Sequence, residues 1–145
     1  MGGRMIRMRL RSTVCLILLT AGMLRSVTAG DQKSKRLPVG SWGGQGIRLE
    51  TSDSGATIEY DCAHGSIDQP ITLDDSGRFD VKGLHSREHG GPVREGEQAK
   101  GEPVRYVGQT DGDTLSLTVH FVNRDETIGT FTLVRGKPGR IRRCL

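Results

Sequence analysis

The sequence lacks several patterns that would point to a class of function. No serine lies in a Gly-x-Ser-x-Gly elbow and no glycine cluster matches a phosphate-binding loop, so neither an α/β-hydrolase nor a P-loop protein is indicated. Beyond residue 29 there is no second apolar run, no helical periodicity and no clear internal repeat. Aromatic residues make up only 4% of the chain. These absences argue against a helical or membrane-spanning domain and leave no catalytic signature.

The first 29 residues have the composition of a secretory signal peptide. Four arginines between positions 4 and 11 precede an apolar run, Val14–Leu24, which is too short to span a bilayer. Val27-Thr28-Ala29 then supplies small residues before a cleavage point at Gly30. We therefore expect a periplasmic or secreted protein with three parts: a signal peptide (1–29), a flexible leader (30–39) and one domain (40–145).

Removal of the signal peptide changes the charge of the chain. The whole sequence carries 21 basic and 17 acidic residues, and five of the basic ones but none of the acidic ones lie in residues 1–29. The remaining 16 basic and 17 acidic side chains give a net charge near −1. This balance argues against nucleic-acid binding, which requires a basic surface. We expect no nucleic acid partner, no stable membrane insertion and a monomer.

Cysteine usage fits an oxidising compartment. Cys15 lies in the apolar run and leaves with the signal peptide, so Cys62 and Cys144 remain as an even pair. In exported proteins such a pair usually forms a disulfide, and we predict a Cys62–Cys144 bond. A pair of zinc-ligating thiolates or two free thiols are the alternatives.

The rest of the chain shows the alternation of antiparallel β-strands. In residues 113–122, Leu115, Leu117, Val119 and Phe121 fall on one face and polar side chains on the other. Turn sequences that combine Asp with Gly separate such runs, at residues 53–55, 75–77 and 111–113. We predict an all-β, single-domain antiparallel meander of about eight strands that closes into a small barrel or a flattened sandwich.

Two resemblances bear on the fold. Gly40-Ser41-Trp42, before the first predicted strand, is similar to the Gly-x-Trp signature of lipocalins. That lipocalin-like resemblance implies a buried Trp42 at the base of the barrel, with Arg140, Arg142 or Arg143 from the last strand over its ring. Trp42-Gly43-Gly44 is interpreted as a place where another stretch of backbone crosses near the Trp42 ring.

The second resemblance covers nearly the whole mature chain. It is to a group of small exported bacterial proteins of unassigned activity, and it implies export and the extent of the domain but no chemistry. It rests on Trp42-Gly43-Gly44, Asp61-Cys62-Ala63-His64-Gly65, Gly90-Gly91-Pro92-Val93, Thr127-Ile128-Gly129-Thr130-Phe131 and Cys144.

One long connection stands apart from the predicted meander. Residues 85–102 contain four Gly, one Pro and seven charged side chains, and a connection of this length is usually functional or loosely ordered. A solvated loop without a site is one interpretation. The other is a contact surface for an envelope protein or glycan, made by polar side chains of this loop and of His64. The predicted binding residues are His64, His85, Arg87, Glu88, His89 and Arg94.

A metal site is the alternative use of the histidines. His64, His85 and His89 could hold Zn²⁺, with Asp61 or Glu88 as the fourth ligand or as a hydrogen-bond partner of a ligating histidine. The protein would then be a zinc-dependent hydrolase or a metal-binding protein. A His-x-x-x-His pair needs a helix to align both rings, however, and Gly90-Gly91-Pro92 opposes one. We therefore predict no metal and no cofactor.

The carboxylates that could supply an acid–base pair for glycoside hydrolysis lie at turns or on the polar faces of strands, where solvated structural roles are expected. They are Asp61, Asp68, Asp74, Asp75 and Asp80. We predict no catalytic residue. The predicted function is a small secreted or periplasmic, non-enzymatic binding or inhibitor module.

Overall fold

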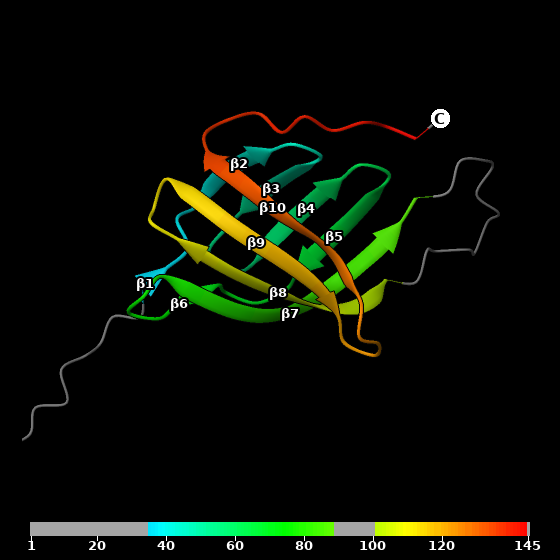
Figure 1. Ribbon diagram of the computed structural model, residues 1–145. Coiled ribbons are helices and arrows are strands. Elements are labelled where there is room, and N and C mark those ends of the chain that lie inside the picture. Colours follow the sequence, from blue (N-terminus) through cyan, green and yellow to red (C-terminus); the bar gives the residue numbers. More distant parts are fainter. Residues whose placement is uncertain (1–34, 89–100, 145) are drawn as a thin grey trace, which may run out of the picture. The chain divides into compact units, whose positions relative to one another are not determined.

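The computed structural model describes residues 35–88 and 101–144, which form an all-β domain (Figure 1). Eight antiparallel strands close into a barrel in the order β10-β2-β3-β4-β5-β7-β8-β9, which confirms the predicted fold class. No helix that could cross a membrane occurs in these two ranges. The barrel strands are β2 (Gly40–Gly44), β3 (Ile47–Thr51), β4 (Ala56–Tyr60), β5 (Ala63–Ile67), β7 (Arg78–Arg87), β8 (Glu102–Thr110), β9 (Thr114–Phe121) and β10 (Thr127–Arg135).

A two-stranded sheet lies outside the barrel and involves residues that were expected in the leader. β1 (Lys35–Arg36) pairs with β6 (Thr72–Leu73), and Leu37 is buried in the core cluster. The prediction that the flexible leader extends to residue 39 is therefore wrong for residues 35–39. A buried leucine and two backbone pairs hold this segment against the domain, whereas composition alone indicated only a polar segment.

The core fills the barrel as the alternation predicted. The inward side chains of β9, from Leu115 to Phe121, are all at least nine-tenths buried. The ring of Tyr106 on β8 occupies the space left by Gly83 on β7, since a Cβ there would lie 2.6 Å from Cε2 of Tyr106. Tight packing of this kind leaves the middle of the barrel full and confines open space to its ends.

Trp42 is fully buried, as predicted, but no arginine covers its ring. It lies on β2 opposite Leu49 and Arg135, and its indole N–H donates to the Pro38 carbonyl at 3.4 Å. In the described ranges the cation–π contact is Arg124 over Phe121, at 3.5 Å, and Trp42 takes part in none. The prediction of a Trp42–arginine pair is wrong because the last strand ends at Arg135, before the C-terminal arginines begin.

Residues 136–144, here called the C-terminal segment, run instead outside the barrel across the β2–β3 hairpin (Figure 1). The Arg140 N–H donates to the Gly44 carbonyl, and the Gly46 N–H donates to the Arg140 carbonyl, both at 2.9 Å. Gly43 allows this approach, since a Cβ on Gly43 would lie 2.5 Å from the Gly139 nitrogen. Another stretch of backbone therefore crosses at Trp42-Gly43-Gly44 as predicted, but it passes the outer face at Gly43 while the Trp42 ring lies inside the barrel.

Cys144, the last residue of the C-terminal segment, forms a disulfide with Cys62, as predicted from the cysteine count. The two Cα atoms are 5.1 Å apart, within the usual range for a disulfide. Beside the bond, the Arg142 N–H donates to Oδ1 of Asp61 at 2.6 Å. The chain end is thereby attached to the turn between β4 and β5.

We predict that replacing both cysteines, Cys62→Ser with Cys144→Ser, lowers the melting temperature. The bond closes a loop with a sequence separation of 82 residues, for which the chain-entropy model gives at most about 4–5 kcal/mol. Thermal unfolding followed by circular dichroism, with and without reductant, measures the effect. A reactive thiol in the native, non-reduced wild-type protein would contradict the assignment.

We predict that Trp42→Ala destabilises the domain by about 3–5 kcal/mol, the usual cost of truncating a buried aromatic side chain. Urea unfolding gives this free energy, and the single Trp makes native fluorescence a direct probe of burial. Emission at the wavelength of free indole, with ready quenching by acrylamide, would show that Trp42 is exposed.

Candidate functional site

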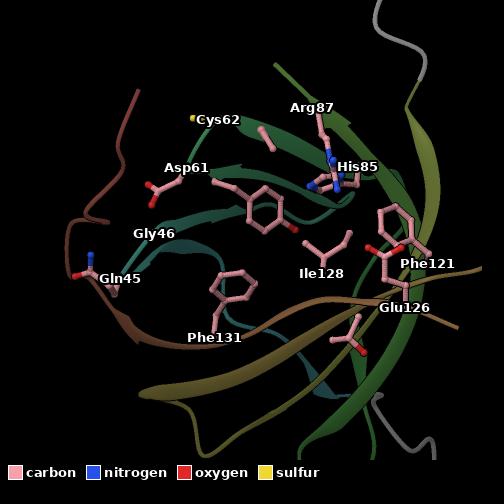
Figure 2. Close-up of a pocket in the computed structure, with 13 residues that line it drawn as sticks. Gln45, Gly46, Asp61, Cys62, His85, Arg87, Phe121, Glu126, Ile128 and Phe131 are labelled. Carbon is pink, nitrogen blue, oxygen red and sulfur yellow. The ribbon is translucent and has the colours of Figure 1, made fainter. Parts of the chain in front are cut away.

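A pocket of about 470 Å³, here called the mouth pocket, opens at the barrel end that carries the β4–β5 turn and the β9–β10 loop (Figure 2). Its volume lies within the range of small-molecule sites in proteins. The residues that line it are Gln45, Gly46, Tyr60, Asp61, Cys62, Ala63, His85, Arg87, Phe121, Glu126, Thr127, Ile128 and Phe131.

Strand alternation brings the pocket residues together. His85 and Arg87 are two positions apart on β7, so both side chains face inward, and Arg87 pairs in register with the buried Ala63 of β5. On the opposite wall, β10 is irregular between Thr127 and Gly129. Such a bulge changes the direction of side chains locally, and Ile128, which lies within it, lines the pocket.

The wall and floor of the pocket are aromatic. The Tyr60 ring lies 5.2 Å from the His85 ring and 5.7 Å from the Phe131 ring, measured between centroids. The Phe121 ring meets His85 edge-on at 6.1 Å. These four rings come from β4, β7, β9 and β10, and they offer an apolar surface that a ligand ring or short chain can contact.

Two buried tyrosine hydroxyls close the floor. The Tyr60 hydroxyl donates to that of Tyr106 at 3.3 Å, and Tyr106 donates to the Leu84 carbonyl at 2.9 Å. Burial raises the pKa of both phenols, that of Tyr106 to about 12. Both are therefore neutral at physiological pH, so the floor of the pocket carries no charge.

His85 is 5% exposed, and its ring makes no hydrogen bond to any described residue. Burial lowers the pKa of His85 from its usual value, and the nearby charge of Arg87 lowers it further, as does His64 more weakly. Glu102 acts in the opposite direction. The imidazole is consequently neutral at pH 7 and presents one N–H donor and one acceptor nitrogen.

The charged groups of the pocket differ in whether they have partners. Glu126 accepts from Nε of Arg124 at 2.7 Å, and Asp61 accepts from the Arg142 backbone N–H. Arg87 lies at the exposed rim and forms no ion pair with another described residue. Figure 2 shows the nitrogen-bearing ends of Arg87 and His85 together on one wall, while the Asp61 carboxylate turns away from the centre.

The structure separates the residues predicted to form one loop surface. His85 and Arg87 belong to β7 and Glu102 begins β8, so the prediction of a loop from His85 to Glu102 is wrong at both ends. Strand pairing continues further than the sequence suggested, and Leu84 pairs with Pro103. His89 and Arg94 lie outside the described residues.

His64 and Glu88 lie on the outer side of the barrel, away from the mouth pocket. His64 pairs in register with Ser86, so its side chain points to the face opposite that of His85. It is exposed, with Nδ1 3.6 Å from a Glu88 carboxylate oxygen. The zinc alternative needed the rings of His64 and His85 to converge, and the alternation of the strands prevents this. In the described part of the chain no three potential ligands come together.

The aspartates have structural positions. Asp74 accepts from the backbone N–H groups of Ser76 and Arg78, and Asp80 pairs with Arg105 on the outside of the barrel. Asp68 and Asp75 are exposed.

Sequence reasoning missed most of the pocket. Of the predicted binding residues that the structure describes, only His85 and Arg87 line it, and the aromatic wall was assigned to strands without a functional role. The pocket could have been recognised from aromatic residues at the ends of strands, since Tyr60 is the last residue of β4 and Phe121 is the last residue of β9.

No protein family, curated protein or solved structure matches the chain.

We predict that His85→Phe reduces the loss of stability in acid. Unfolding returns the pKa of His85 toward its ordinary value near 6.5, so as the pH falls through that value the unfolded chain takes up a proton that the folded chain does not. The free energy of unfolding is therefore unaffected by His85 above about pH 6.5 and decreases below it, as the unfolded chain takes up the proton. Melting temperatures at pH 7.5 and 5.5 measure the loss, with His64→Gln as the exposed control. Equal losses in wild type and His85→Phe would contradict the prediction.

Proposed function

We propose that this protein is a non-enzymatic binding module whose site is the mouth pocket, and that its ligand is a small amphipathic molecule. One observation carries the proposal: a pocket of about 470 Å³ combines an aromatic wall with polar groups that have no partner among the described residues. Ligand sites typically join apolar walls to a few directed polar groups in this way.

The rigidity of the site supports binding. Tyr60 packs against both His85 and Phe131, and each of the three lies on a strand of the closed barrel. Side chains held on strands lose little conformational entropy when a ligand binds, so the pocket is formed before the ligand arrives. The disulfide at Cys62 fixes the adjoining rim.

The earlier alternatives receive less support. A contact surface on the long connection would have to do without His85, which faces the interior, and a zinc-dependent enzyme would require ligands that point to opposite faces. Export to the periplasm or the medium remains part of the proposal. The signal-like segment supports it, and a disulfide is compatible with that location.

We predict that the mature protein binds N-phenyl-1-naphthylamine, a neutral dye that fluoresces in apolar sites, saturably and with one site per chain. Phe131→Ala and Ile128→Ser should each weaken binding about tenfold, because both side chains line the pocket. Thr132→Ala, on the outer face of the same strand, should bind as wild type does.

Circular dichroism verifies that each variant is folded. Unsaturable fluorescence in the wild-type protein, or unchanged affinity in both pocket variants, would show that the mouth pocket is not a binding site.

A further inference from the structure

We propose that the mouth pocket selects a carboxylate: an aromatic or short aliphatic acid whose anionic end is held by Arg87 and His85. This inference rests on the proposed binding function and names the chemical class of its ligand. The juxtaposition that carries it is a rim cation and a buried imidazole on one strand, facing an aromatic wall (Figure 2).

The balance of donors and acceptors at the pocket favours an acceptor ligand. Arg87 offers five N–H donors in a planar fork and His85 offers one, and neither side chain is hydrogen-bonded to a described residue. The two acidic groups of the lining already accept, Glu126 from Arg124 and Asp61 from Arg142. The Arg87 and His85 side chains, which have no described partner, therefore offer six N–H donors and a single acceptor nitrogen.

The same comparison argues against an ammonium ligand, although aromatic rings can also bind cations. Phe121 already carries the Arg124 guanidinium over its ring at 3.5 Å. Arg124 also pairs with Glu102 and Glu126, which uses the negative charge on that side of the pocket. A second cation placed there would be repelled by Arg124 and would compete for carboxylates that are already bonded.

The placement of the groups sets the orientation of the ligand. Arg87 is exposed at the rim, His85 lies two residues further into the barrel, and the centroid of the Tyr60 ring lies 5.2 Å from that of His85. A carboxylate at the rim would accept two parallel hydrogen bonds from Arg87, the geometry in which guanidinium and carboxylate bind most strongly. The apolar part of the ligand then contacts Tyr60 and Phe131, on a floor that is neutral.

Three naphthalene compounds with the same ring and different charge test the inference: 1-naphthylacetate (anion), 1-naphthylacetamide (neutral) and 1-naphthylmethylammonium (cation). Their affinities for the mature protein are measured by displacement of N-phenyl-1-naphthylamine and directly by calorimetry at pH 7.5. We expect the anion to bind about ten times more tightly than the amide, which is the ratio that 1.4 kcal/mol produces, and the cation to bind most weakly.

Variants assign the preference to its residues. Arg87→Gln should reduce the ratio of anion to amide affinity to within about twofold while leaving amide affinity nearly unchanged. His85→Phe, which keeps a ring of similar shape but removes its N–H, should reduce the ratio about threefold. Arg135→Gln makes the same charge change at the opposite end of the barrel and should keep the wild-type ratio.

The outcomes separate the two proposals. If the dye binds and its affinity depends on Phe131, but the wild type binds the three naphthyl compounds equally or prefers the cation, the carboxylate inference is overturned and the binding function stands. The inference is also overturned if Arg87→Gln retains the full preference for the anion. If neither the dye nor any naphthyl compound binds at millimolar concentration, both proposals fail.

Discussion

The short seam between β10 and β2 is the constraint on which the rest of the structure depends. It closes the barrel, yet only three residue pairs join the two strands, from Leu133–Gly44 to Arg135–Trp42. β10 continues to Thr127 beyond the seam, where it pairs with β9 but not with β2. The barrel is thus closed near Trp42 and open toward the other end, and the mouth pocket lies between the first residues of β10 and the β2–β3 turn.

The C-terminal segment stabilises the end of the barrel that the seam leaves open. Its hydrogen bonds to Gly44 and Gly46 add backbone pairing beside β2, and its disulfide to Cys62 joins the β4–β5 turn to the chain end. These bonds lie on the outer side of the rim, so they brace the pocket without filling it.

The fold could be predicted from the sequence to the extent that its signals are local. Alternation at Leu115–Phe121 and Asp-Gly turns are properties of neighbouring residues, and they correctly indicated an all-β domain of about eight strands. The candidate site could be predicted only in part. His85 and Arg87 were recognised as polar groups with a role, but the end of their strand was mistaken for a loop because the Gly, Pro and charged residues that follow resemble a linker.

What the sequence by itself determined is the periodicity of the strands, the turns and the pair of cysteines, since each follows from residue type and spacing. Tertiary structure alone decided which ends of the strands remained open, because closure depends on the register between β2 and β10, which are far apart in the chain. Register also decided that His85 faces the aromatic wall while His64 faces outward. A shift of one residue reverses every side chain of a strand, so the pocket exists only through pairings that local sequence does not specify.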